Sequence, residues 1–486
     1  MKKIMIIGAG LGGLASAIRL AYRGYQVTIL EKEQTVGGKL QRVVSDGYRF
    51  DLGPSTITMK HVFESVFEDS GRRMEDYLEF YHLPMGTRNF FEDGSVVDFC
   101  PDVDKVEQQI ANYSTEDAKQ YRAFLKDSAK LYYIANDQFL NKLLYDWKAK
   151  LNPKLLVSFL KVKPMTNFDK WLQSYFKHPN TLAMFGRYAT YVGSSPYQAP
   201  ATFGMMAHLE GNQGVYGVKG GTYSIVEAFQ KLAEELGVTV QLNTKVERIL
   251  VKDRRAVGVE TNLGTYDADE IIANADALTV REKLLSNDRK LDRVEPSLSG
   301  FALLLGVESK YDQLTHHNVF FPQHYKAEFD AIFTYKKMPE NPTIYICNSG
   351  FTDKTAAGQM TSNLFVLVNA PVVSENTDWT KNKEIVTEKI IAKLEAKGLT
   401  GLNKHLTYKC TMTPEDIEQR TGAYKGSIYG MSSNSFKQAF FKIPNKDNQI
   451  KHLWYVGGSS HPGGGTPIVT LSGMLVADKI HKINTL

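Results

Sequence analysis

The sequence contains little cysteine and no long apolar run. Its 486 residues include three cysteines, Cys100, Cys347 and Cys410, which lie far apart and form no C-x-x-C pair. This spacing argues against a zinc ribbon and a redox dithiol, and it fits reduced thiols in the cytosol. No uninterrupted apolar run reaches the roughly 18 residues that predict a transmembrane helix, although attachment to one face of a membrane stays open.

A large excess of either charge is also missing. Lys and Arg total 58 and Asp and Glu total 53, which leaves a formal charge of +5 with no acidic or basic tail. We therefore expect no nucleic-acid partner. Hydrophobic residues make up 43% and charged residues 23%, as in a folded protein, and the length suits two or three domains. Aromatic residues, at 11%, either line a large apolar cavity or, more often, fill a core.

The N-terminal segment predicts a dinucleotide-binding turn. The apolar run at residues 4–7 is typical of a buried strand, and a helical pattern follows at residues 14–21. Between them lie three glycines in G-x-G-x-x-G spacing: Gly8, Gly10 and Gly13. The first allows a tight turn, the second lets the backbone approach a pyrophosphate, and the third lets the helix pack on the strand. Glu31, after the strand predicted at residues 27–30, would accept a hydrogen bond from a ribose hydroxyl.

The residues after Glu31 favour FAD over NAD. They include a glycine pair and two basic residues: Gly37, Gly38, Lys39 and Arg42. This arrangement resembles the extended fingerprint of the amine-oxidase-like flavoproteins, in which the pair and the following basic residue approach the pyrophosphate and ribityl chain of FAD. The same resemblance implies that the backbone of Val246 meets the adenine. No second strand–G-x-G-x-x-G–helix unit occurs, which disfavours the disulfide reductases that bind NAD(P)H.

The middle of the chain has helical patterns at residues 115–143 and 155–176. Between residues 147 and 168 the chain carries no acid but five lysines among apolar residues: Lys148, Lys150, Lys154, Lys161 and Lys163. This pattern fits an interfacial anchor for anionic lipid and, equally, an amphipathic helix with a solvated lysine face. The aromatic run at residues 187–192 could line a tunnel but by itself favours packing.

The second half of the chain alternates predicted strands and helices. Residues 214–275 include Gly220-Gly221, a helix and several strands, which indicates a return to the dinucleotide-binding domain. Residues 300–408 mix strands with a helix at 383–397 and predict the sheet of a substrate domain. His316 and His317 invite a metal interpretation, which we reject because no further ligand follows at metal spacing. No metal is expected.

The C-terminal segment predicts a second glycine-rich loop, between a strand at residues 453–456 and a helix at 468–480. The loop contains Gly457, Gly458, His461, Thr466 and Pro467. A loop that leads into a helix N-terminus is a platform for an anion or a flavin ring. His461 and Thr466 are the candidate catalytic residues, and Arg42 is a third candidate for contact with the ring. His461 either relays a proton or braces the loop, with bracing favoured.

Residues 453–473 resemble the signature of the bacterial-type phytoene desaturase family, which includes FAD-dependent carotenoid desaturases and diapocarotenoid oxygenases. The N-terminal fingerprint and Gly220-Gly221 lie at family-like positions, so the resemblance spans nearly the whole chain. Ser460 and Gly464 depart from the desaturase pattern. The segments at residues 191–195, 316–318 and 413–418 look closer to the oxygenase branch.

The resemblance implies an α/β fold. We expect a Rossmann-like FAD-binding domain of the amine-oxidase and phytoene-desaturase type, a discontinuous α+β substrate domain and a helical membrane-facing part. The FAD-binding domain would comprise residues 1–90, 214–295 and 410–486. The helical region would comprise residues 91–213, and the substrate-domain sheet residues 296–409.

The resemblance also implies an enzyme that oxidises a long polyene, with FAD as the hydride acceptor. In the oxygenase branch the terminal methyl group of a C30 diapocarotenoid becomes an alcohol and then an aldehyde. In the desaturase branch a proton leaves and a double bond forms. O2 or a quinone would take the electrons. An amine oxidase and a non-catalytic flavoprotein are weaker alternatives. Because a carotenoid is insoluble in water, we expect peripheral attachment to the cytoplasmic side of a membrane through residues 147–168.

Overall fold

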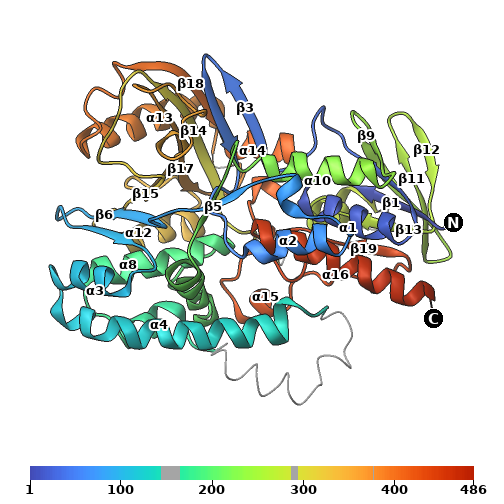
Figure 1. Ribbon diagram of the computed structural model, residues 1–486, viewed down its shortest axis with the longest axis horizontal. Helices are drawn as coiled ribbons and strands as arrows, with labels where there is room; N and C mark the ends of the chain where they lie inside the picture. The colour runs from blue at the N-terminus through green and yellow to red at the C-terminus, as the bar shows by residue number, and fades with distance from the viewer. Residues whose placement is uncertain (144–164, 286–293, 376, 486) are drawn as a thin grey trace.

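The computed structural model describes residues 1–143, 165–285, 294–375 and 377–485 (Figure 1). The body at the right of Figure 1 contains both chain ends and a five-stranded sheet in the order β19-β13-β1-β2-β9. All four pairings in this sheet are parallel. Its strands are β1 (Lys3–Ile7), β2 (Gln26–Leu30), β9 (Thr239–Gln241), β13 (Glu270–Ala273) and β19 (Leu453–Tyr455).

Helices cover this parallel sheet, as its nearly continuous apolar strands require. Contacts join α1 to both α10 and α16, and a shared apolar core holds these helices to the sheet. A separate antiparallel sheet in the order β10-β11-β12 extends the same body. The elements are α1 (Leu11–Tyr22), α2 (Lys60–Glu68), α10 (Ser224–Glu235), α16 (Thr466–Thr485), β10 (Val246–Lys252), β11 (Arg255–Thr261) and β12 (Gly264–Asp267).

The second body, at the left of Figure 1, is organised around a seven-stranded sheet in the order β18-β14-β17-β16-β15-β6-β7. Helix α13 (Trp379–Ala396) closes one face with an apolar cluster around Trp379. The strands are β6 (Thr87–Phe90), β7 (Val96–Phe99), β14 (Ser299–Val307), β15 (His317–Phe320), β16 (Ile344–Asn348), β17 (Ser362–Ala370) and β18 (Leu406–Met412).

Two short pairings connect the bodies. Strand β3 (Gln41–Ser45) forms a hairpin with β4 (Tyr48–Leu52), and aromatic residues of β4 pack on the large sheet. Strand β5 (Phe80–His82) pairs with β8 (Tyr216–Val218). Shorter helices are spread through the second half of the chain: α9 (Met206–His208), α11 (Ala277–Thr279), α12 (Tyr325–Phe329), α14 (Pro414–Thr421) and α15 (Phe436–Phe440).

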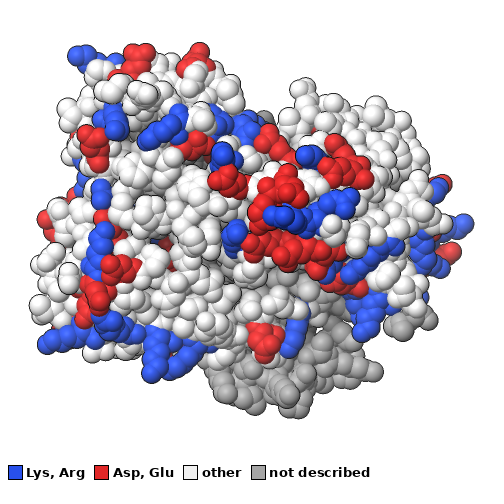
Figure 2. All heavy atoms as spheres, in the orientation of Figure 1, with Lys and Arg blue, Asp and Glu red and all other residues white. Residues whose placement is uncertain are grey.

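A helical layer lies below the large sheet in Figure 1. It comprises α3 (Val103–Ala111), α4 (Thr115–Ala135), the π-turn η2 (Asn136–Leu140), α7 (Phe168–Gln173) and α8 (Pro179–Gly186). An aromatic core that includes Phe124, Trp171 and Phe185 holds the layer together. Among the described helices none is both long and apolar enough to cross a membrane. On the face in Figure 2 acidic and basic side chains are interspersed, in keeping with the small net charge.

The predicted α/β fold is confirmed, and most strands and helices lie where their patterns indicated them. The strands of the large sheet do not follow the domain boundaries that were predicted from the sequence. Strands β6 and β7 fall within the segments predicted as the FAD-binding domain and the helical region, yet both belong to the large sheet. Strand β18 crosses the predicted boundary at residues 409–410. Residues 147–164 of the predicted lipid anchor lie outside the described part of the chain.

Candidate active site

A cavity of about 500 Å³ lies where the two bodies and the helical layer meet. Glycine-rich turns of the parallel-sheet body form one end, which we call the glycine end: Gly10, Gly37, Gly38, Gly457 and Gly458. Side chains from the large sheet and the helical layer form the other, which we call the side-chain end: Arg187, Tyr191, Phe203, Met206, Tyr345, Phe365 and Leu367. The volume is within the usual range for a cofactor or ligand site.

The N-terminal glycines have the backbone conformations that their motif requires. Gly8 follows β1 with a φ of +96°, which favours glycine, and Gly10 precedes the first turn of α1 at the cavity wall. A Cβ at Gly13 would lie 2.4 Å from the carbonyl oxygen of Gly8. Helix α1 therefore packs against its own turn only because Gly13 lacks a side chain. The side chain of Asn274 donates a hydrogen bond to the Gly8 carbonyl oxygen and lies beside Gly10.

Two predicted nucleotide contacts lie outside the cavity lining. The Glu31 carboxylate, 6% exposed, accepts hydrogen bonds from the backbone N–H groups of Ala9 (2.8 Å) and Glu33 (3.0 Å). Glu31 thus holds the glycine turn in place, and its oxygens keep further lone pairs for a ribose hydroxyl. Val246 is the first residue of β10 and is buried. Its contact with adenine stays a prediction.

The glycine pair continues the glycine end. Gly37 (φ +117°) donates its backbone N–H to the carbonyl oxygen of Ala9, and Gly38 (φ +63°) lies beside Gly10. The Lys39 ammonium donates to the carbonyl oxygens of Ser427 (3.3 Å) and Ile428 (2.5 Å) at the cavity wall. Burial lowers the pKa of Lys39, and the nearby Asp276 partly offsets this.

Arg42 does not line the cavity. Its guanidinium donates to the carbonyl oxygen of Gly220 (2.8 Å) and to Ser224, contacts Asp51 and Glu227, and lies over the Tyr223 ring. The predicted direct contact with a flavin ring has no support here. Arg42 instead connects the hairpin β3–β4 to the start of α10.

The C-terminal glycine-rich loop forms the rest of the glycine end of the cavity. Gly457 (φ +94°) follows β19 and donates its N–H to the Ser472 hydroxyl, while Gly458 and Pro467 line the cavity. Thr466 begins α16 and is 3% exposed, and its Oγ1 has no hydrogen-bond partner in the described part of the chain. A buried hydroxyl without a partner on a cavity wall indicates an absent polar group. The glycine turns and this hydroxyl fit FAD.

The His461 side chain connects the C-terminal loop to the helical layer. Its Nε2 lies 2.8 Å from the carbonyl oxygen of Lys142 and 3.1 Å from that of Phe139, at the end of η2. A carbonyl oxygen only accepts, so Nε2 carries the proton and donates it. Of the two interpretations of His461, this geometry favours bracing, because the ring nitrogen is engaged with the helical layer. The residue also lines the cavity.

The side-chain end contains a buried polar network that the sequence analysis did not identify. Glu210 accepts hydrogen bonds from Tyr188 (3.0 Å) and Tyr191 (2.6 Å) and pairs with Arg187 at 3.5 Å. Arg187 and Glu210 are 5% and 0% exposed. Both interpretations of the aromatic run at residues 187–192 therefore hold, since Tyr188 packs in the core and Tyr191 lines the cavity. In the sequence, the feature that could have predicted this buried ion pair is Arg187 itself, a charged residue at the start of an aromatic run.

Two further residues near the cavity escaped the sequence analysis. Lys442 lines the wall beside Gly463, and burial lowers its pKa to about 8. Tyr345 lines the side-chain end and forms hydrogen bonds with Ser55 and with Nδ1 of His317. No local pattern distinguishes such residues, because each is set at the cavity by pairing between distant segments.

The two adjacent histidines lie beside a third possible metal ligand. Cys347 pairs with His317 across β15 and β16, and burial keeps all three side chains from water. Burial lowers the pKa of His316 to about 4, so its imidazole is neutral at physiological pH. Cys347 lies on the neighbouring strand, thirty residues further along the chain, so the spacing of possible ligands around His316 and His317 in the sequence does not reveal it.

Comparison with known proteins places this site in context. Residues 11–385 match the model of a family described as flavin containing amine oxidoreductase. The 4,4'-diapolycopene oxygenase of Methylomonas sp is 37% identical over 488 residues, which cover 99% of this chain and 98% of that protein. The 4,4'-diaponeurosporene oxygenase of Staphylococcus aureus (strain USA300) is 36% identical over 492 residues, with the same coverage of 99% and 98%.

Solved structures of amine oxidases share the fold. Putrescine oxidase bound to putrescine superposes with a TM-score of 0.68 at 14% identity, covering 99% of each chain. Cyclohexylamine oxidase from Brevibacterium oxydans IH-35A gives a TM-score of 0.65 at 14% identity and covers 100% of both chains. At such identity the likeness establishes the fold alone.

Proposed function

Because this chain belongs to the family of flavin-containing amine oxidoreductases, and is a FAD-dependent oxidoreductase, we propose that it is a carotenoid oxygenase. The proposed reaction converts the terminal methyl group of a C30 diapocarotenoid, such as 4,4'-diaponeurosporene, to an aldehyde. The observation that carries the proposal is the near-full-length similarity to two proteins named as diapocarotenoid oxygenases. The apolar side-chain end of the cavity supports it, because a polyene offers only apolar surface for recognition.

The residues of the cavity have separate tasks in this proposal. Bound FAD supplies the hydride acceptor. The glycine end would hold it, since backbone N–H groups approach a pyrophosphate closely where no Cβ intervenes. Thr466 Oγ1 would hydrogen-bond the cofactor from the start of α16. Apolar walls from β16, β17 and the helical layer would orient the polyene and exclude water from its oxidised end.

Product analysis tests the proposal directly. The FAD-loaded protein is incubated in air with 4,4'-diaponeurosporene in liposomes, and FAD-free protein serves as the control. We expect a product that has gained one oxygen atom and lost two hydrogen atoms at the terminal methyl group. Loss of hydrogen with no gain of oxygen would overturn the oxygenase assignment and place the protein with the carotenoid desaturases.

The source of oxygen and the electron acceptor belong to the same proposal. We propose that O2 or a quinone takes the electrons. Reaction under labelled O2, and separately in labelled water, identifies the origin of the aldehyde oxygen. Turnover with a quinone and without O2 would assign the quinone as acceptor, and failure with both acceptors would contradict this part of the proposal.

We also propose peripheral attachment to the cytoplasmic face of a membrane through residues 147–168. The supporting argument is that the substrate dissolves only in lipid, and that this segment is basic and apolar. Replacement of Lys148, Lys150 and Lys154 by Glu should release the protein from anionic liposomes. The matched control changes three exposed lysines of the large-sheet body to Glu: Lys381, Lys389 and Lys404. Equal binding of both triple variants would contradict the proposal.

A further inference from the structure

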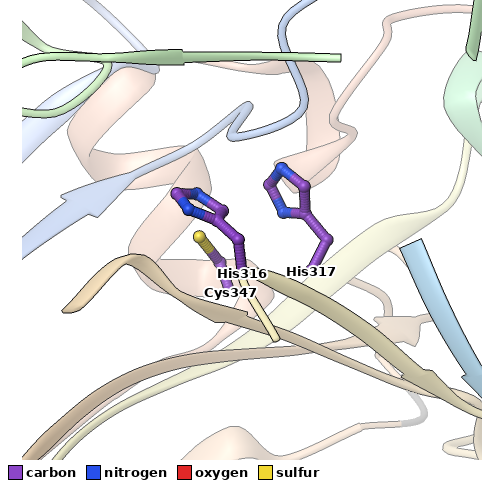
Figure 3. Close-up of side chains that lie close together, drawn as sticks. All are labelled: His316, His317 and Cys347. Carbon is purple, nitrogen blue, oxygen red and sulfur yellow. The ribbon is translucent and has the colours of Figure 1, made fainter. Parts of the chain in front are cut away.

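Three side chains with metal-binding atoms meet beside the large sheet. His316 and His317 lie at the start of β15, and Cys347 lies on β16 (Figure 3). One ligand atom of each residue lies within 4.8 Å of the other two. The three side chains are almost fully buried, with His316 8%, His317 0% and Cys347 7% exposed. In Figure 3 the Cys347 sulfur lies next to the His316 ring.

The hydrogen bonds of the two histidines leave donor atoms for a cation. His316 Nδ1 lies 2.6 Å from Thr352 Oγ1, and His317 Nδ1 lies 2.7 Å from the Tyr345 hydroxyl. In protein metal sites one ring nitrogen of a ligating histidine is normally held by such a partner while the other binds the ion. His317 Nε2 is buried and has no hydrogen-bond partner in the described part of the chain. An unpartnered buried nitrogen calls for a ligand.

A small polar cavity adjoins the cluster. It has a volume of about 30 Å³, and its wall includes His316 and Cys347 together with hydroxyl, amide and carboxylate side chains: Ser55, Ser349, Asn363, Asp51 and Asp353. A space of this size accommodates a water molecule. Both carboxylates are already paired with arginines, Asp51 with Arg42 and Asp353 with Arg49, so we do not assign them as ligands.

We propose that His316, His317 and Cys347 bind Zn2+, with a water molecule from the small cavity as the fourth ligand. Two imidazoles and one thiolate suit a borderline-soft divalent cation rather than Mg2+ or Ca2+. Ligand atoms around tetrahedral Zn2+ lie roughly 3.5 Å apart, so the ligand atoms of the three side chains, which lie within 4.8 Å of one another, would come closer together on binding. On binding, the thiol proton of Cys347 passes to solvent and a Zn–S bond forms.

The ion would connect two strands and the wall of the large cavity. His317 and Cys347 are register partners in β15 and β16, so Zn2+ would cross-link the strands at one edge of the small cavity. The His317 ring also stacks on Tyr345, with ring centroids 5.9 Å apart, and Tyr345 lines the large cavity. Zn2+ bound to His317 would therefore fix the orientation of the Tyr345 hydroxyl at the side-chain end.

Zinc titration tests the proposal on the full-length, FAD-loaded protein. The protein is first freed of metal by a chelator and then titrated with Zn2+ in competition with a chromogenic chelator. We expect one equivalent to bind, and affinity to fall by roughly tenfold or more in Cys347→Ser and in His317→Gln. The thiol controls are Cys410→Ser, on β18, and Cys100→Ser, a buried cysteine in another core, and both should bind Zn2+ as the wild type does.

Cobalt spectroscopy gives a second readout that does not depend on whether a variant folds. Co2+ added to the metal-free wild type should produce tetrahedral d–d bands at wavelengths beyond the flavin absorption, with a thiolate charge-transfer band in the difference spectrum. Absence of Zn2+ and Co2+ binding by the wild type, or equal affinity in Cys347→Ser, would overturn the proposal. Because no substrate is present, such a failure leaves the proposed carotenoid oxidation unaffected.

Discussion

The two ends of the large cavity differ in the atoms that form their walls. At the glycine end the backbone itself forms the wall, because Gly10, Gly38 and Gly457 place no side chain between it and a ligand. At the side-chain end, rings, aliphatic groups and the Arg187 side chain form the wall, and the buried Glu210 pairs with Arg187 behind it. Because the glycine end is made of backbone, it suits a common cofactor such as FAD. Single substitutions can change the shape of the side-chain end without changing the conformation of the glycine turns.

The largest effect should follow from breaking the charge pair at the side-chain end. Glu210→Gln leaves the buried Arg187 without an opposing charge, which should lower the free energy of unfolding by about 3–5 kcal/mol. Denaturant titration measures this change. The double variant Arg187→Met/Glu210→Gln should recover much of the loss, because no unpaired charge remains.

The control for the charge pair is Glu260→Gln, which breaks the exposed pair with Arg248. Its effect should stay below about 1 kcal/mol, since solvent screens that pair. If Glu210→Gln and Glu260→Gln lowered the free energy of unfolding equally, burial would not determine the strength of the Arg187–Glu210 pair.

A smaller effect should follow from removing the half-buried charge of Lys442 beside the C-terminal loop. The folded protein holds the proton of Lys442 less tightly than the unfolded chain, with a pKa of about 8 against 10.5. Protonation therefore opposes folding below pH 8, and this penalty disappears as the pH rises towards 10.5. FAD-free Lys442→Met should be more stable than FAD-free wild type by about 2–3 kcal/mol at neutral pH.

The pH dependence separates charge from packing in the Lys442 test. The difference in unfolding free energy should shrink between pH 8 and 10.5. Lys437→Met, which removes an exposed lysine of α15, should show no such trend. A gain in Lys442→Met that persists at high pH would instead come from better packing of the methionine.

The glycine end is tested by adding a single methyl group. Gly13→Ala places a Cβ 2.4 Å from the Gly8 carbonyl oxygen, so α1 must shift away from the turn. Overpacking of this kind costs about 1–3 kcal/mol, and FAD affinity should fall by roughly ten- to a hundredfold. Flavin retained after gel filtration measures the loss. Gly358→Ala, at an exposed turn, should retain FAD, and retention by both variants would contradict the role assigned to Gly13.

The smallest effect is expected at His461, which joins the glycine end to the helical layer. His461→Gln can still donate a hydrogen bond to the Lys142 carbonyl oxygen, so stability should fall by about 1 kcal/mol or less. The shape of the pH profile for carotenoid oxidation should not change. Loss of one limb of that profile would instead identify His461 as a proton relay.

The patterns that predicted the glycine end were local. The strand at residues 4–7, the three glycines and the following helix are adjacent in sequence, and the C-terminal strand, loop and helix repeat that logic. Each turn needs specific φ values and close helix packing, which only glycine permits at Gly8 and Gly13. These requirements act within about thirty residues, so they can be seen in the sequence alone.

Local sequence patterns did not predict contacts between segments that are distant in the sequence. Strand β6 lies parallel to β15, more than two hundred residues further along the chain, so no local periodicity assigns it to the large sheet. The contact between His317 and Cys347 has the same origin, as does the position of Arg42 against Gly220 rather than at the cavity wall. Strand register is set by the hydrophobic pattern of both partners and by turn geometry, which one segment does not contain.

By itself, the sequence indicated a dinucleotide-binding turn near the N-terminus, a FAD-type glycine pair, a second glycine-rich loop near the C-terminus and a family resemblance along nearly the whole chain. Only the tertiary structure decided which side chains surround the cavity, that Arg187 of its wall pairs with the buried Glu210, and that His316, His317 and Cys347 meet. The reason is physical. Backbone turns depend on neighbouring residues, whereas cavities and ligand clusters depend on which distant surfaces pack together.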